Sequence, residues 1–403
     1  MFSDPSSTML QKFSKVLIGS NLGTENTQNI HPKTIVKEFS SFQTKVPDGF
    51  VIDVVNTNQE LKRAIARANK NNGQTAIYLQ DGNYNLGKTI RIVANDIMFL
   101  SVSGNPYKTS ISGLGMKQTK GVHNIFEVRA DGFVLDGILL TDAPNHLIQI
   151  AAEDNASRPI IRNCILQDSY EQMLKVSYDQ ASRPKNISYD GVVEQCIFQY
   201  THGIAPYYYT GGIDALGAKG WRVENNIFKD IASPSKHIAQ HAVHFWVNAS
   251  DNIVSHNIFI DNDRSIGFGM KQSRRQVESL DYFSQGGIIS KNVIYHSDNG
   301  DPFADTGIIL EASLDTIVKD NYIYMQHGYP RAIEYRFKET RNAIIENNNT
   351  NRLISSRDGG TAKLSGNKNN LNSLTFFYKL ESALTTQNIL HLAQPVNGES
   401  KND

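Results

Sequence analysis

A short phrase that recurs about every 30 residues constrains the fold of this chain more than any other feature of its sequence. Each copy holds a β-branched residue, two mostly polar residues, a small or amide residue and an apolar pair. Clear copies lie at 160–166, 192–198, 222–228, 253–259, 288–294 and 317–323, and weaker copies at 133–139 and 343–349. A repeat of this length, with short strands and no helical periodicity, is typical of one coil of a β-helix. We therefore expect an all-β, single-stranded, right-handed parallel β-helix with three short strands per coil.

The fourth position of the phrase predicts a ladder of polar side chains. It holds Gly137, Cys164, Cys196, Asn226, Asn257, Asn292, Asn321 and Asn348. Asn suits a left-handed backbone bend, and amides stacked coil upon coil can hydrogen-bond one another. Because Cys164 and Cys196 occupy this position in adjacent coils, we expect them to be small buried residues. A disulfide between them is the less favoured alternative.

Residues 57–72 predict a helix at the N-terminal end of the coils. Apolar residues recur at helical spacing at Leu61, Ile65 and Ala68, and Thr57 and Glu60 fit a capping box. The unpaired strand edge of a first coil invites aggregation, so we expect this helix to cover it. The repeats divide the chain into a leader at 1–45, a β-helix domain at 46–370 and a C-terminal cap or tail at 371–403.

Charge and composition exclude several classes of partner. Lys plus Arg and Asp plus Glu number 40 each, so no overall field draws the chain to nucleic acid or to an anionic membrane. No apolar stretch approaches the roughly 20 residues that span a bilayer. Two cysteines cannot support a disulfide framework. The N-terminus lacks a basic segment followed by an unbroken apolar one, so it does not read as an intact signal peptide.

Several segments of the chain resemble a known group of proteins. Residues 60–86 resemble the first coils of pectate-lyase-like β-helix proteins. Residues 211–231, 241–270, 286–295 and 332–337 are similar to secreted bacterial right-handed β-helix proteins. That group includes a lyase from biofilm-matrix gene clusters that degrades the matrix exopolysaccharide. The resemblance covers roughly residues 50–365 and implies a carbohydrate substrate and a secreted or periplasmic location, but no family catalytic motif matches residue for residue.

Alternation along one set of strands predicts the functional face. These strands lie at 172–178, 211–217, 241–247, 264–270, 306–312 and 331–337. Because side chains alternate in and out of a strand, one outward row holds Lys175, Asp214, His244, Gly267, Ile309 and Glu334. A second outward row holds Ser177, Leu216, Trp246, Gly269, Glu311 and Arg336.

The spacing of coils brings the first of these residues together. Coils stack at about 4.8 Å, so Lys175, Asp214 and His244 are expected within about 10 Å of one another. Gly267 and Gly269 are expected to leave a hollow for a sugar ring, with Lys271 at its edge. Arg264 either points inward or turns outward at the start of its strand. His241 is expected to pack within the coil.

Two loops are expected to border this face. Residues 202–210 carry Tyr207, Tyr208 and Tyr209, whose rings suit sugar faces and whose hydroxyls can bond sugar oxygens. Residues 271–285 carry Arg274 and Arg275, which can grip carboxylates. Outward polar residues on a β-helix are more often plain solvated surface, so only their combination in successive coils favours a site.

The leading functional hypothesis is β-elimination on a uronate-containing polysaccharide. His244 or Lys175 is the expected base, Lys271 or Arg336 the expected charge neutraliser, and Asp214 orients the cations. Bound Ca²⁺ is an alternative neutraliser that the sequence does not require.

Two other functional classes stay open. A glycoside hydrolase would draw on the acids Asp214, Glu311 and Glu334, and a non-catalytic carbohydrate binder needs none of these roles. The long apolar termini through which tailspikes trimerise are not evident, so a monomer is expected.

Overall fold

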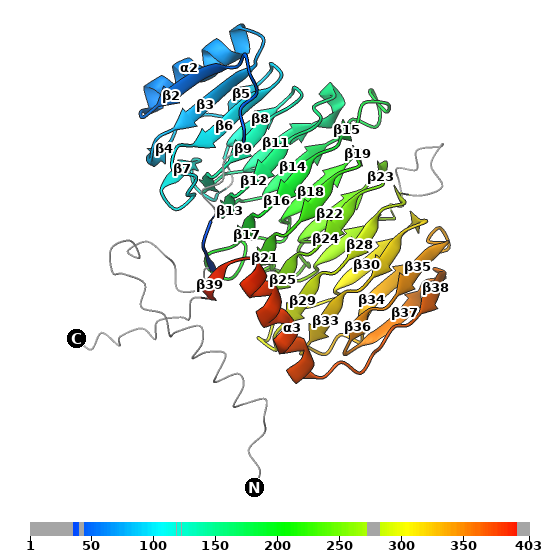
Figure 1. Cartoon of the computed structure of the whole chain (residues 1–403). Helices are drawn as coiled ribbons and strands as arrows, with labels where there is room; N and C mark the ends of the chain where they lie inside the picture. Colours follow the sequence, from blue (N-terminus) through cyan, green and yellow to red (C-terminus); the bar gives the residue numbers. More distant parts are fainter. Residues whose placement is uncertain (1–34, 40–43, 118, 122, 272–282, 393–403) are drawn as a thin grey trace, which may run out of the picture.

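The chain folds into a right-handed parallel β-helix, as the repeat predicts (Figure 1). The computed structural model describes residues 35–39, 44–117, 119–121, 123–271 and 283–392. Successive coils stack along one axis, and their strands form three long parallel sheets and one short one. Each sheet therefore lines up residues that lie about one repeat apart in the sequence.

The first two sheets carry the repeat phrase. The first contains β2 (Val51–Val55), β3 (Thr75–Leu79), β6 (Ile97–Ser101), β9 (Val134–Asp136), β12 (Ile160–Arg162), β16 (Val192–Glu194), β20 (Arg222–Glu224), β24 (Ile253–Ser255), β28 (Ile288–Ser290), β32 (Ile317–Lys319), β35 (Ala343–Glu346) and β38 (Ala362–Ser365). The second contains β4 (Gly82–Tyr84), β7 (Thr109–Ser112), β10 (Leu139–Thr141), β13 (Ile165–Gln167), β17 (Ile197–Gln199), β21 (Ile227–Lys229), β25 (Ile258–Ile260), β29 (Val293–His296), β33 (Tyr322–Met325) and β36 (Asn349–Thr350).

The third sheet holds the strands between the phrases. It contains β5 (Ile90–Ile92), β8 (Phe126–Val128), β11 (Ile148–Ala151), β14 (Leu174–Ser177), β18 (Ile213–Leu216), β22 (Val243–Trp246), β26 (Ile266–Phe268), β30 (Ile308–Glu311), β34 (Arg331–Arg336) and β37 (Leu353–Arg357). A short 3₁₀ turn (Ala152–Asp154) follows β11. The fourth sheet contains β15 (Ser188–Tyr189), β19 (Ala218–Lys219), β23 (Ala249–Ser250), β27 (Ser284–Gln285) and β31 (Ser313–Leu314).

The core is a column of like residues stacked coil upon coil. Phe198, Phe228 and Phe259 are paired in register in the second sheet. Their rings stack with centroids 4.8 and 5.0 Å apart and nearly parallel planes. All three are fully buried. Because each coil buries its apolar side chains mainly against its neighbours, the repeat can be read from the sequence.

The predicted asparagine ladder is present, but the left-handed residue is not the asparagine. The Nδ2 of Asn226 donates to the Oδ1 of Asn257 at 3.1 Å, and the same bond continues through Asn292, Asn321, Asn348 and Asn367. The positive φ falls one residue earlier in each coil, at Asn163, Gln195, Asn225, His256, Lys291, Asp320 and Asn347. The bend therefore turns the following amide inward, where its backbone stays in the ordinary region.

The two cysteines are free thiols inside this ladder. Both Cys164 and Cys196 are fully buried and unbonded to each other. The Sγ of Cys164 donates to the carbonyl of Arg162 at 3.0 Å, and the Sγ of Cys196 donates to that of Glu194 at 3.2 Å. They are small ladder residues, and the disulfide alternative is wrong.

Helix α2 (Asn58–Lys70) closes the N-terminal end of the stack, as the capping box predicts (Figure 1). The Thr57 side chain accepts from the backbone N–H of Glu60, and the Glu60 carboxylate accepts from the N–H of Asn56. Leu61, Ala64, Ile65 and Ala68 are buried in the main core. The first coil is thus covered by the apolar side of an amphipathic helix.

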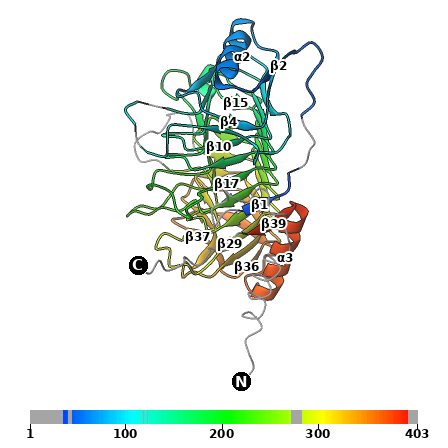
Figure 2. The ribbon, with the colours of Figure 1, turned by 90° about the vertical axis from the view of Figure 1, so that its left-hand side faces the viewer.

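The C-terminal helix lies against the side of the stack. Helix α3 (Ser373–Thr386) packs on the outer surface of the second sheet (Figure 2). Its Phe376 and Leu380 share an apolar cluster with residues of that sheet, and the Phe376 ring stacks on Tyr295 and Tyr324. Beside it, β39 (Ile389–Leu392) pairs antiparallel with β1 (Ile35–Lys37).

The boundaries proposed at residues 46 and 370 stay a prediction, and the strands of the stack run from Val51 to Ser365. Of the helices in the described residues, none has the length and apolar character to cross a membrane.

Candidate functional site

The register of the third sheet places the predicted outward row in one line. Lys175 pairs with Asp214, Asp214 with His244, and His244 with Gly267. The row continues through Ile309 to Glu334. The sequence-based prediction that Lys175, Asp214 and His244 are neighbours is therefore confirmed at the level of backbone register.

Asp214 is the centre of a compact polar cluster. Its Oδ2 accepts a hydrogen bond from the Lys175 ammonium, and its Oδ1 accepts from the indole N–H of Trp246 at 2.5 Å. The Asp214 side chain is 3% exposed and that of Lys175 is 14% exposed. The carboxylate is thus enclosed, while the lysine keeps a small accessible surface.

Charge pairing fixes the protonation of both groups. Burial alone would raise the pKa of Asp214, but the Lys175 ammonium and His244 hold it well below its usual range. Burial would lower the pKa of Lys175, yet the Asp214 carboxylate raises it above its usual value. The lowered pKa of Asp214 and the raised pKa of Lys175 both favour the charged pair. Lys175 is therefore a stable ammonium group that can donate a proton or neutralise an anion.

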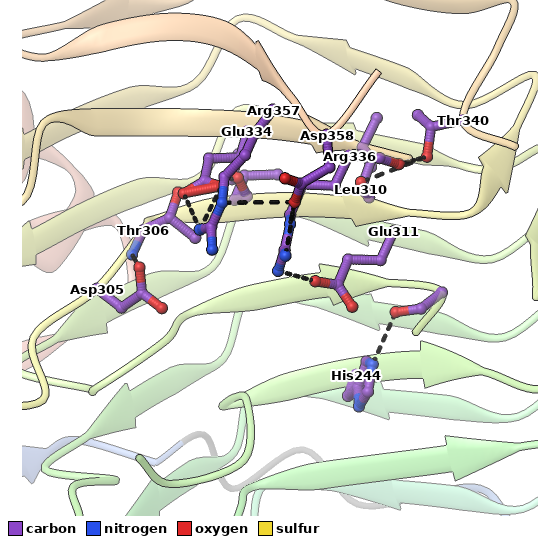
Figure 3. A network of polar contacts seen from close by, with 12 residues as sticks. His244, Asp305, Thr306, Leu310, Glu311, Glu334, Arg336, Thr340, Arg357 and Asp358 are labelled. Atoms are coloured by element: carbon purple, nitrogen blue, oxygen red, sulfur yellow. Dashed lines mark hydrogen bonds and ion pairs between the residues drawn. The ribbon is translucent and has the colours of Figure 1, made fainter. Parts of the chain in front are cut away.

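Both ring nitrogens of His244 face oxygen atoms of the protein. Its side chain is fully buried. Its Nε2 donates to the carbonyl oxygen of Gly269 at 3.0 Å (Figure 3), and its Nδ1 lies 3.6 Å from the Oδ1 of Asp214. The ring also stacks on Trp246, with centroids 5.2 Å apart. These contacts make His244 a support for Asp214 and Trp246 and remove it as the base.

The hollow predicted at Gly267 and Gly269 is absent. A Cβ on Gly267 would lie 2.7 Å from the Nε2 of His241, because the imidazole fills the space above that glycine. A Cβ on Gly269 would collide with the backbone of Glu311. His241 was expected within the coil, but its ring lies on the outward side of the sheet. Both glycines therefore make room for protein atoms.

Arg264 turns outward beside His241. Its Nε donates to the carbonyl of Ala239 at 3.3 Å. Burial lowers the pKa of Arg264 from its usual value. The carboxylates of Asp305 and Glu311 lie close enough to interact with its charge and act in the opposite direction. Among the described residues no carboxylate forms an ion pair with it. Arg264 is thus a partly buried cation with donors to offer an anion.

The other predicted cations are already paired. The Nζ of Lys271 lies 3.0 Å from Glu339, away from the predicted hollow. The guanidinium of Arg336 donates to Glu311 at 2.5 Å and to Asp358 at 2.8 Å (Figure 3). Neither is a free neutraliser in this arrangement.

Glu334 likewise forms its hydrogen bonds and its ion pair with other residues of the protein. Its side chain is fully buried. It accepts a hydrogen bond from the hydroxyl of Tyr329, and the Nη1 of Arg357 donates to it at 3.2 Å. A direct contact between Glu334 and a substrate does not fit this position.

The tyrosine loop lies at one side of the Lys175 cluster. Tyr208 and Tyr209 are 41% and 38% exposed, and Tyr209 is close enough to Lys175 to interact with its charge. The hydroxyl of Tyr207 donates to Glu171 at 3.3 Å, and its ring stacks on Tyr170 at 4.3 Å. The predicted sugar-binding residues Arg274 and Arg275 lie outside the described residues.

Two residues of the site were missed from the sequence. The Nε2 of His146 lies 3.7 Å from the Oε2 of Glu171, and its Nδ1 donates to the carbonyl of Gln172 at 2.8 Å. Burial, with Lys175, lowers the pKa of His146 to about 4, and burial raises the pKa of Glu171. Both precede their strands, at corners where simple alternation does not apply.

The described residues contain no group of three or more His, Cys, Asp or Glu side chains that could hold a metal ion. The alternative neutraliser Ca²⁺ thus gains no support from the donor groups of these residues.

Comparisons with known proteins add likenesses of shape. No family model matches the sequence, and no curated protein matches it. An alginate lyase from Paenibacillus is 11% identical, with a TM-score of 0.46, over 79% of this chain and 99% of that one. A tailspike protein of E. coli bacteriophage HK620, solved with a pentasaccharide, is 12% identical (TM-score 0.49; 80% of this chain, 63% of that one). The catalytic unit of an α-1,3-glucanase from Streptomyces thermodiastaticus is 11% identical (TM-score 0.49; 82% and 70%).

Proposed function

We propose that the outer face of the third sheet cleaves an acidic polysaccharide by β-elimination. The observation that carries this proposal is a pair of cations on one face, of which one has a carboxylate partner and the other has none among the described residues. Lys175 is held as an ammonium by buried Asp214, and Arg264 makes no ion pair among the described residues. A uronate needs one cation at its carboxylate and a proton donor at its leaving oxygen, which this pair can supply.

Lys175 and Arg264 each lean toward the coils that lie between them. Lys175 lies on β14, and Arg264 lies two residues before β26, which is three coils away, or about 14 Å along the axis at the usual strand spacing. Lys175 leans one coil forward to Asp214, and Arg264 bonds the carbonyl of Ala239, which precedes the strand one coil back. The separation along the axis is therefore shortened from both sides.

The reaction assigns a role to each group. Arg264 neutralises the carboxylate, so that the C5 proton becomes acidic enough to be removed by a base. The C4–O bond then breaks, a double bond forms between C4 and C5, and the leaving oxygen takes a proton from Lys175. Asp214 and Trp246 orient Lys175. A raised pKa makes Lys175 the acid of this reaction rather than its base.

Residues 211–231 and 241–270 resemble secreted bacterial β-helix proteins, a group that includes a biofilm-matrix lyase, and this resemblance supports a matrix exopolysaccharide as the natural substrate. A polymer of that kind also favours a place of action outside the cytoplasm. Exposed Tyr208 and Tyr209 supply rings and hydroxyls that suit a sugar chain.

Ultraviolet absorbance of the product tests the reaction class. Purified protein is incubated with a panel of acidic bacterial exopolysaccharides, and a neutral polysaccharide is the control. β-Elimination produces an absorbing 4,5-unsaturated uronate on the acidic polymers only. New reducing ends without absorbance would contradict elimination and identify hydrolysis.

A glycoside hydrolase is the second candidate, and one observation favours it. Asp305 and Glu311 both lie near Arg264, and burial raises the pKa of Asp305, as suits a general acid. The acids first expected for hydrolysis fit less well, because Asp214 is held ionised and Glu334 is enclosed.

A further inference from the structure

His241 occupies an unusual place for a buried histidine. It lies two residues before β22, and its ring covers the outer side of the third sheet above Gly267. The ring centroid lies 4.4 Å from that of His244. The residue is 4% exposed. The imidazole is therefore wedged between a neighbouring ring and a glycine that leaves it space.

Neither ring nitrogen of His241 has a hydrogen-bond partner among the described residues. Buried polar groups are nearly always hydrogen-bonded, because an unpaired one costs roughly 1–3 kcal/mol. A histidine kept only for packing would be replaced by an apolar residue without this cost. The unpaired nitrogens therefore indicate a group reserved for a ligand or a proton.

The surroundings keep this imidazole neutral. Burial is the largest cause, and the nearness of His244 and of the Arg264 guanidinium adds to it, so the pKa of His241 lies well below its usual range. The charged groups beyond this first contact are Lys175 and Asp214, which neutralise one another. A neutral imidazole with unpaired nitrogens can accept a proton.

We propose that His241 is the general base that removes the C5 proton of the sugar whose carboxylate Arg264 binds. This inference rests on the proposed β-elimination and completes it. The C–H electron pair becomes the new C4–C5 double bond, His241 takes the proton, and Lys175 protonates the departing oxygen. The ring nitrogens are enclosed in the free protein, so a neighbouring side chain must shift when substrate binds. Arg264 is the side chain we infer to move with the carboxylate, since it lies close enough to affect the pKa of His241 and its hydrogen bond to Ala239 is long, at 3.3 Å.

Chemical rescue tests this role directly. In His241→Ala the cavity left by the ring can admit free imidazole. We expect kcat on the acidic polysaccharide to fall by about 100-fold or more with little change in KM, and added imidazole to restore part of it. A merely structural histidine would give no such rescue. Unchanged kcat, or a loss that imidazole does not relieve, overturns the proposal.

Gly267→Ala provides a second variant that leaves His241 in the sequence. The three atoms nearest to the new Cβ all belong to the His241 ring, at 2.7–2.8 Å, so this ring must shift. We expect a loss of kcat without loss of the cooperative unfolding transition. Gly328→Ala is the matched control, because nothing lies within 4 Å of a Cβ at that position. Equal kcat in the two variants would overturn the role of the ring.

The two proposals fail in different ways. If the unaltered protein forms no unsaturated product from any acidic polysaccharide, the proposed function falls, and the base falls with it. If the unaltered protein eliminates and His241→Ala keeps its rate, the reaction class stands and only the assignment of His241 is wrong.

Discussion

Two regions on the outer face of the third sheet contain similar charged side chains but differ in how completely these side chains are paired. The downstream network consists of Glu311, Glu334, Arg336, Arg357 and Asp358, on and just after strands β30, β34 and β37. In it Arg336 is bonded by Glu311 and Asp358, and Arg357 lies within 4 Å of Glu334 and Asp358 (Figure 3). Every charge of the downstream network has a partner.

The upstream cluster consists of Lys175, Asp214, His241, His244 and Arg264. Asp214 is the one carboxylate among these five residues, and it forms an ion pair with Lys175. Arg264 has no ion pair among the described residues, and His241 has two unpaired nitrogens. A satisfied network stabilises the coil, whereas an unsatisfied one leaves capacity for a substrate. The comparison teaches that pairing, more than residue type, separates structure from function on this face.

Removing Asp214 should give the largest difference in stability and cleavage between the two regions. Asp214→Ala leaves the Lys175 ammonium without its buried partner, so we expect about 3–5 kcal/mol less stability and loss of cleavage. Urea unfolding and the rate of product formation measure the two effects. Asp358→Asn is the downstream control, and it should leave cleavage within a few-fold of normal. A larger loss of cleavage in Asp358→Asn would reverse the assignment of the two regions.

Replacing the arginines one at a time should separate their roles. Arg264→Lys removes the planar pair of donors for a carboxylate, and we expect kcat/KM to fall about 100-fold. Arg336→Lys disturbs the ion pairs with Glu311 and Asp358 and should change kcat/KM by less than about fivefold. Steady-state kinetics on one acidic polysaccharide gives both values. Equal losses would show that the downstream network also binds substrate.

Acid should destabilise the fold through His146, which lies at the corner beside the upstream cluster. The pKa of His146 is lowered to about 4, so below the usual histidine value the unfolded chain binds a proton that the folded chain does not. Stability is therefore complete above pH ~6.5 and declines toward pH 4, by roughly 3 kcal/mol for this shift.

His146→Gln should remove part of this decline in urea unfolding measured between pH 7 and pH 4, since burial also lowers the pKa of His327 to about 4 and His327 keeps its own share. The depressed pKa values of Asp214 and Asp358 act in a lower window, because carboxylates of this kind lose their contribution only below about pH 4. A decline that His146→Gln leaves unchanged would place the acid-sensitive group elsewhere.

The smallest effect is expected at the exposed aromatic edge. Tyr208→Ala removes a ring that is 41% exposed and makes no described contact with Lys175. We expect KM to rise by about two- to fivefold with kcat unchanged, since such a ring adds about 0.5–1 kcal/mol of sugar contact. A drop in kcat as large as that of Arg264→Lys would move the reaction centre toward the loop.

Sequence periodicity predicts the parts of the molecule that repeat. The coil length, the amide ladder from Asn226 onward and the alignment of Lys175, Asp214 and His244 all follow from strands of period two stacked at one repeat. These features depend on local pattern and on the identity of successive coils, which are both visible in one sequence.

Sequence periodicity did not predict which side chains are buried or which charges are paired. His244 has the predicted register, yet His241 and Trp246 cover it. Arg336 has the predicted direction, yet Asp358 binds it from the next coil. Corner residues such as His146 follow neither period. Burial and pairing arise from loops and corners that do not repeat, so they become visible only in three dimensions.

The uniform height of the coils makes the β-helix a molecular ruler. Each coil advances the surface by about 4.8 Å, which is close to the length of one hexose unit in an extended glycan. A polymer lying parallel to the axis would present one sugar to each coil. Inserting or deleting a whole coil between β14 and β26 would then shift the distance between acid and neutraliser by a single monosaccharide step.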